Sequence, residues 1–160
     1  DTQIEEMELI AKNLLNENSF YQYEVSSWAK DNSFSRHNMN YWMYGDFLGL
    51  GPGAHSKITF ENSIKRMVKL KKVGSYIKSP SQVTEQEVSI DGYDIDLAMN
   101  LLRLKNGVSF NELKKRKIYL TETFIKKLEK GIESNLLEKS DIKATDIGYK
   151  FLNDTVNLFS

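Results

Sequence analysis

The sequence has 160 residues, 40% of them hydrophobic, which is enough to bury a sizeable core and excludes a globally disordered chain. Lys and Arg number 22, as do Asp and Glu, and the resulting net charge of zero argues against a general binder of polyanions or of membrane surfaces. Cysteine is absent, which excludes disulfides, zinc ribbons, Cys nucleophiles and Cys-ligated iron–sulfur clusters within this chain. No apolar run approaches the roughly 18 residues of a membrane span, and no signal peptide is recognisable. Because the chain opens on Asp1-Thr2 and not on Met, we expect it to be a fragment of a longer, cytoplasmic protein.

The first half of the chain predicts helices alternating with strands. A capping box at Thr2-x-x-Glu5 precedes apolar residues at helical spacing, so a helix should extend to about residue 16. Alternating polar and apolar residues predict a strand at Tyr21–Ser26, followed by a long loop with one helical turn near Asn38–Trp42. The remaining expected elements are a strand at 47–50 that runs into a glycine-rich turn, a strand at 57–60 and an amphipathic helix at 62–78.

The second half predicts a helical unit. Residues 79–92 are polar and include Pro80, so we expect a linker there. Tyr93–Leu104 is apolar almost all round, which predicts a buried central helix. Ser109, Thr121 and Thr145 have the positions of helix caps, and 136–139 with 142–144 should form a small hairpin. The fold expected is therefore α+β, with one domain at 1–78 and a winged-helix-like domain at 93–160.

The segment Ser35–Trp42 brings an imidazole, amides and two large aromatic side chains within one or two turns. His37 could be an axial ligand of an iron-bearing macrocycle, and the neighbouring aromatic rings could pack against its flat face. The alternative is a packed loop in which the aromatic residues belong to the core and His37 makes only local hydrogen bonds.

A second cluster, Gly49 to Ser56, is rich in glycine and follows an expected strand. Its backbone N–H groups could approach a ligand or cradle an anion, but it matches neither the dinucleotide-binding fingerprint nor a Walker loop. A glycine-lined bend without a ligand is the alternative. Basic residues near 103–117 could contact nucleic acid, but a solvated charged face explains them better, and we expect no nucleic-acid partner. No nucleophile–base–orienter triad is recognisable.

Three strings together resemble a known family: YEVS at 23–26, SRHNMNYW at 35–42 and GDFLGLGPGAHS at 45–56. They are similar to the oxygen-independent coproporphyrinogen-III-oxidase-like radical S-adenosylmethionine (SAM) proteins, in the branch regarded as heme chaperones. The strings LLRLKNGV at 101–108 and LLE at 136–138 resemble the C-terminal region of proteins in the same family. The resemblance covers essentially the whole chain.

The resemblance implies that 1–78 holds the last elements of a partial β/α barrel. The family binds a [4Fe–4S] cluster and SAM through a Cys-x-x-x-Cys-x-x-Cys motif, which this cysteine-free chain lacks, so we expect no SAM cleavage by the chain itself. The family's H-N-x-x-Y-W motif is associated with heme binding. The residues that the resemblance assigns to heme are His37, Asn38, Tyr41 and Trp42, with His37 as the possible iron ligand. Those assigned to the SAM side are Gly51, Gly53 and His55.

The function implied is that of a heme chaperone, which binds heme and transfers it to acceptor proteins. The alternative is an oxygen-independent coproporphyrinogen III oxidase, which decarboxylates coproporphyrinogen III oxidatively to protoporphyrinogen IX in heme biosynthesis. Strands of an incomplete barrel would leave unpaired edges, so a homodimer through residues 21–56 is also expected.

Overall fold

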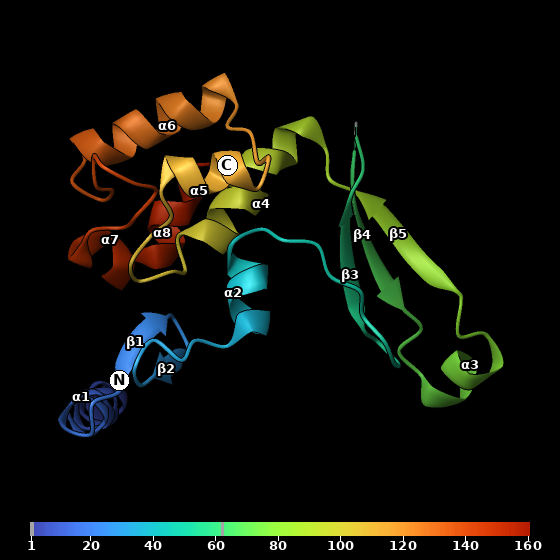
Figure 1. Cartoon of the computed structure of the whole chain (residues 1–160), viewed down its shortest axis with the longest axis horizontal. Helices are drawn as coiled ribbons and strands as arrows, with labels where there is room; N and C mark the ends of the chain where they lie inside the picture. Colours follow the sequence, from blue (N-terminus) through green and yellow to red (C-terminus); the bar gives the residue numbers. More distant parts are fainter. Residues whose placement is uncertain (1, 62) are drawn as a thin grey trace.

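The computed structural model describes residues 2–61 and 63–160. Figure 1 shows a three-stranded sheet on one side, the C-terminal helices on the other, and the first helix with a short hairpin apart from both. The elements are, in chain order, α1 (Thr2–Glu17), β1 (Tyr21–Glu24), β2 (Ser27–Ala29), α2 (Arg36–Trp42), β3 (His55–Thr59), β4 (Ile64–Lys69), α3 (Val73–Lys78), β5 (Val83–Glu87), α4 (Ile90–Leu101), α5 (Phe110–Lys115), α6 (Glu122–Glu133), α7 (Asp146–Lys150) and α8 (Leu152–Asn157).

The N-terminal helix is confirmed, and none of its described residues is buried. Five of its apolar residues are at least 60% exposed, namely Ile4, Met7, Leu9, Ile10 and Leu14, whereas Leu15 is partly buried. Thr2 lies inside the helix and is not its cap, and residue 1 lies outside the described residues. The expected strand at 21–26 is confirmed as β1, which pairs antiparallel with β2. The strand β2 was not predicted, because its three residues, Ser-Trp-Ala, form a strand only through pairing with β1.

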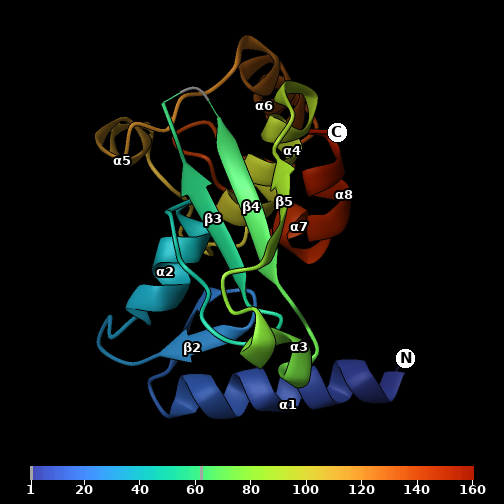
Figure 2. The same ribbon diagram turned by 90° about the vertical axis from the view of Figure 1, so that its right-hand side faces the viewer.

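The three-stranded sheet corrects the largest error of the sequence prediction. Residues 62–78 were expected to form one helix, whereas the structure has strand β4 and the short helix α3 there, with residue 62 outside the description. Strand β4 pairs antiparallel with β3 on one side and with β5 on the other, as Figure 2 shows from the sheet side. Two ladders of backbone hydrogen bonds thus outweigh the helical periodicity of this segment. Residues 79–92 likewise hold β5 and the start of α4, where a polar linker was expected.

The expected strand at 47–50 is reduced to a single bridge between Phe47 and Lys57. Its neighbours Leu48 and Leu50 are exposed. All pairs between the named strands are antiparallel, whereas the strands of a β/α barrel run parallel. The barrel origin of 1–78, the division into two domains and the homodimer through strand edges all stay predictions.

The C-terminal helices follow the local sequence signals. The side chains of Ser109, Thr121 and Thr145 each accept a hydrogen bond from the backbone N–H three residues ahead, so the three expected caps are confirmed. The expected hairpin of 136–139 with 142–144 is reduced to a single antiparallel bridge between Leu137 and Ala144, and Ile142 also bridges Val108. Within the described residues the buried apolar cluster comes from 93–160 apart from Tyr44, so this part has its own core. The winged-helix-like assignment stays a prediction.

Candidate functional site

Helix α2 carries the four residues assigned to heme and divides them between two faces. Ser35 caps the helix, because its Oγ accepts a hydrogen bond from the Asn38 N–H at 3.3 Å. Residues four apart lie on the same side of a helix. His37 and Tyr41 therefore form one pair, and Asn38 and Trp42 form another on an adjoining face.

The first pair presents an aromatic surface on which Tyr41 is partly buried. His37 is exposed, and its ring centroid lies 4.8 Å from that of Tyr41 at an interplanar angle of 64°. Tyr41 in turn stacks on Phe47, with centroids 3.9 Å apart and planes 27° apart. Phe47 is held in this place by reciprocal backbone hydrogen bonds with Lys57, at 2.9 and 3.0 Å. The result is an accessible imidazole beside two stacked rings, a combination that can supply a metal ligand and a flat apolar contact together.

The second pair faces the protein. The Asn38 amide donates to Tyr23 Oη at 3.3 Å and to Ser27 Oγ at 3.1 Å, so it joins α2 to the β1–β2 hairpin. Trp42 lies beneath the guanidinium of Arg103, which is 4.2 Å from its ring centroid. The four residues of the motif thus share one helix but do not converge on one point. Asn38 and Trp42 anchor the helix, and His37 and Tyr41 remain accessible.

The glycine-rich segment uses its backbone N–H groups internally. Gly49 donates to Ser56 Oγ at 2.9 Å, Gly51 to Tyr76 Oη at 3.2 Å and Gly53 to the Leu70 carbonyl at 2.9 Å. These N–H groups are therefore engaged and do not form an anion cradle in this arrangement. Gly51 and Gly53 have positive φ angles of 110° and 70°, which explains the glycines as turn residues. His55 is exposed at the first position of β3.

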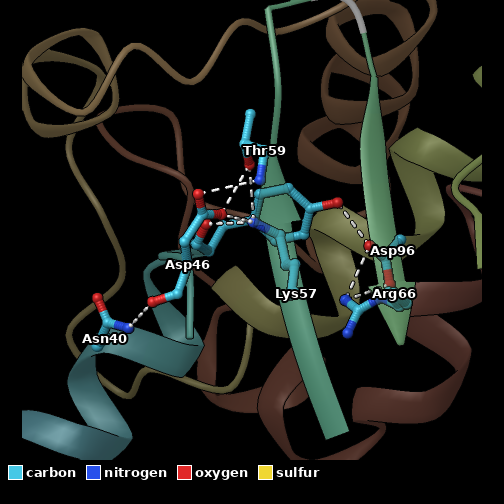
Figure 3. Close-up of polar contacts among 7 residues, drawn as sticks. Asn40, Asp46, Lys57, Thr59, Arg66 and Asp96 are labelled. Carbon is cyan, nitrogen blue, oxygen red and sulfur yellow. Dashed lines mark hydrogen bonds and ion pairs between the residues drawn. The ribbon is translucent and has the colours of Figure 1, made fainter. Parts of the chain in front are cut away.

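A polar network behind α2 was missed by the sequence analysis. Figure 3 shows Lys57 of β3 at its centre, with Asp46 and Thr59 on one side and the Asp96–Arg66 pair on the other. Lys57 is 1% exposed, and its Nζ donates to the Tyr44 carbonyl at 3.0 Å, to Asp46 Oδ1 at 3.1 Å and to Thr59 Oγ1 at 3.2 Å. No sequence motif marks these residues, because they come from segments that only the tertiary structure brings together.

The network continues to the central helix. Tyr44 Oη donates to Asp96 Oδ2 at 2.5 Å, and one Arg66 nitrogen donates to both Asp96 oxygens, at 2.8 and 2.9 Å. These contacts connect the end of α2 and strand β4 to α4. Asn40 adds a hydrogen bond from its amide to the Asp46 carbonyl at 2.8 Å, which fixes the segment that leaves α2.

The environment shifts the pKa values of the network in physically understandable directions. Burial lowers the pKa of Lys57 against the opposing effect of Asp46. Burial alone would raise the pKa of Asp46, but hydrogen bonds from Thr59 and Lys57 outweigh it and hold that pKa below its ordinary value. Burial and the hydrogen bond to Asp96 raise the pKa of Tyr44 far above its ordinary value, so Tyr44 stays a neutral donor.

Two cavities flank the site. One of about 1180 Å³ borders the network at Tyr44 and Asp46 and extends to Tyr93 and Tyr119. The other, of about 1430 Å³, lies between the N-terminal elements and the C-terminal helices and includes Arg103 in its wall. His37 and Tyr41 line neither of them.

The chain offers no ligands for an iron–sulfur cluster. It has no cysteine, and within the described residues no three His, Asp or Glu side chains gather into a group that could hold a metal ion. These residues do not fit a [4Fe–4S] cluster.

None of the helices in the described part of the chain combines the length and apolar composition that crossing a bilayer requires.

Comparison with known proteins gives relatives over nearly the whole chain. The heme chaperone HemW of Buchnera aphidicola subsp. Schizaphis graminum is 33% identical over 155 residues, which is 91% of this chain and 39% of the relative. That of Haemophilus influenzae is 33% identical over 150 residues, with the same two shares. The mitochondrial radical S-adenosyl methionine domain-containing protein 1 of Danio rerio is 50% identical over 44 residues, 28% of this chain and 10% of the relative. No family model matches, and no solved structure matches.

These relatives connect the chain to the radical SAM proteins as a class. Over nearly its whole length, the chain is similar to proteins named heme chaperone HemW. The chain spans 39–41% of the length of the HemW relatives that match it over most of its own length.

Proposed function

We propose that this chain contributes the heme-contacting surface of a HemW-type heme chaperone, which binds heme and passes it to acceptor proteins. The observation that carries the proposal is the 30–34% identity to proteins named heme chaperone HemW over 91% of this chain. The coproporphyrinogen III oxidase alternative is not favoured, because these relatives carry the chaperone name. Recognition of an acceptor protein is proposed for a full-length protein such as these relatives, and not for this chain alone.

His37 and Tyr41 with Phe47 are the residues proposed to contact heme. An exposed imidazole can coordinate the iron, and the stacked rings of Tyr41 and Phe47, 3.9 Å apart, offer apolar area to the macrocycle. The exposure of His37 supports a transfer role, because a cargo bound there stays accessible to an acceptor. Asn38 and Trp42 serve heme binding indirectly, by anchoring α2.

The remaining cofactors of the family are proposed to bind outside this chain. We propose that a [4Fe–4S] cluster and SAM are bound by a segment that this chain does not contain, since the chain has no Cys. Gly51, Gly53 and His55 are proposed to lie toward SAM, with the glycines shaping the turn and not holding an anion. Residues 1–78 are proposed to close the last part of the barrel, and 93–160 to form the winged-helix-like domain.

The test is heme titration of the full-length protein, followed by the Soret absorbance. Replacing His37 with Ala should weaken binding at least about tenfold and shift the Soret band, because the nitrogen ligand to iron is lost. His55→Ala is the matched control: it removes the other histidine, which is also exposed, and should leave affinity and spectrum unchanged. A His37→Ala protein with wild-type affinity and an unchanged spectrum would refute the assignment.

A further inference from the structure

Arg103 is one of the side chains that join helix α2 to the C-terminal helices. It follows the end of α4 and reaches across to α2 and β1; Figure 1 shows α2 between the β1–β2 hairpin and the C-terminal helices. Its guanidinium lies 4.2 Å from the Trp42 ring centroid, and one of its NH2 groups donates to Glu24 Oε2 at 3.3 Å and to Ser26 Oγ at 3.1 Å. One planar group thus contacts both α2 and the β1–β2 hairpin.

The surroundings hold Arg103 in place. Its carbonyl accepts a hydrogen bond from Tyr149 Oη at 3.1 Å, and two positions later the Lys105 N–H donates to the Tyr23 carbonyl at 3.0 Å. Its partner Glu24 is 1% exposed, so the carboxylate has little water to replace a lost cation. The Nε of Arg103 is buried without a hydrogen-bond partner, so the stacking on Trp42 and the NH2 contacts are what fix the side chain.

Helix α2 cannot hold its own orientation. It has seven residues, about two turns, and isolated helices of this length are unstable. The contacts of its inward face set the rotation about its axis: Asn38 bonds to the hairpin, Trp42 stacks on Arg103, and Met39 and Trp42 pack against the core. Because His37 and Tyr41 are fixed to the same short helix, any rotation there redirects the imidazole.

We infer that Arg103 is a positioning residue for heme binding: by stacking on Trp42 it orients α2 and aims His37 at the iron, although it does not touch His37. This inference rests on the proposed function. Lysine cannot replace arginine in this role, because its ammonium keeps the charge opposite Glu24 but lacks the flat surface that stacks on an indole.

The experiment compares Arg103→Lys with Arg116→Lys in the full-length protein. Arg116 is a matched control, since it also has one carboxylate partner, Glu112 at 3.0 Å, and similar side-chain exposure, 32% against 27%. We expect Arg103→Lys to weaken heme binding about three- to tenfold and to shift the Soret band. In the heme-free protein, hydrogen exchange should speed up over 36–42 but not over α6. Arg116→Lys should change none of these.

A Trp42→Leu background tests the route of the effect. If Arg103 acts through Trp42, the Arg103→Lys change should have no further effect on heme affinity in that background. The inference is overturned if Arg103→Lys leaves affinity, spectrum and α2 exchange as in the wild type, or if its full effect persists without Trp42. Failure of the wild-type protein to bind heme would overturn the proposed function instead, and the exchange comparison would still decide whether Arg103 orients α2.

Discussion

Replacing Lys57 with Met tests how much the buried network stabilises the fold. Methionine keeps the unbranched shape of the stem and removes the ammonium. That ammonium makes three hydrogen bonds of 3.0–3.2 Å and lies 4.1 Å from the Tyr44 ring centroid, in a side chain that is 2% exposed. Its loss leaves the carbonyl of Tyr44 without this partner, while Asp46, 44% exposed, can turn to water.

These contacts give the expected magnitude. Hydrogen bonds to charged groups contribute about 1.5–3 kcal/mol each, and part of this is cancelled by the cost of burying the ammonium. We therefore expect Lys57→Met to lower the free energy of unfolding by about 3 kcal/mol. Lys65→Met is the control on the neighbouring strand. Its ion pair with Glu85 has the same 3.1 Å length, but the two side chains are 38% and 50% exposed. That change should cost at most about 1 kcal/mol.

The assay is urea unfolding of the 160-residue chain, followed by circular dichroism and by fluorescence, with coincident transitions as the two-state check. A loss for Lys57→Met no larger than that for Lys65→Met would refute the reasoning. Such a result would mean that desolvation of the ammonium cancels all three of its hydrogen bonds.

Three further outcomes are expected. The folded pKa of Asp46 lies below its ordinary 3.8, so its contribution to stability should be complete above about pH 5 and disappear as the pH falls through the folded pKa. In an acid titration of stability, Asp46→Asn should lack this step, and an unchanged profile would contradict it. Gly148→Ala should destabilise α7 by about 1–3 kcal/mol, since a Cβ there would meet the Leu136 carbonyl oxygen at 2.0 Å. Gly74→Ala in α3 has open space and should be neutral or stabilise by up to about 1 kcal/mol in thermal unfolding. The chain itself, even after iron–sulfur reconstitution, should form no 5′-deoxyadenosine above background in a SAM cleavage assay, because it has no Cys.

The H-N-x-x-Y-W segment shows which features of the site could be predicted from the sequence. The sequence shows the residue types of this segment and predicts a helical turn near 38–42. The structure has helix α2 there. That Asn38 and Trp42 face the protein while His37 stays exposed could not be predicted, because it depends on Tyr23, Ser27 and Arg103 from other elements. The stacking of Phe47 on Tyr41 was missed for the same reason.

The sequence by itself determined the features whose cause is local. The caps at Ser109, Thr121 and Thr145 depend on a side chain and a backbone N–H three residues away, and the largely buried helix α4, observed at Ile90–Leu101, depends on its own apolar content. Only the tertiary structure determined the conformation of 64–69, where the spacing predicts a helix but β3 and β5 offer backbone partners on both sides. It also determined the burial of Lys57, since two of its hydrogen-bond acceptors lie in the segment after α2, at Tyr44 and Asp46, which meets β3 only when the chain is folded. Local energies are encoded within a few residues, whereas pairing and charge burial depend on which distant segments are brought together.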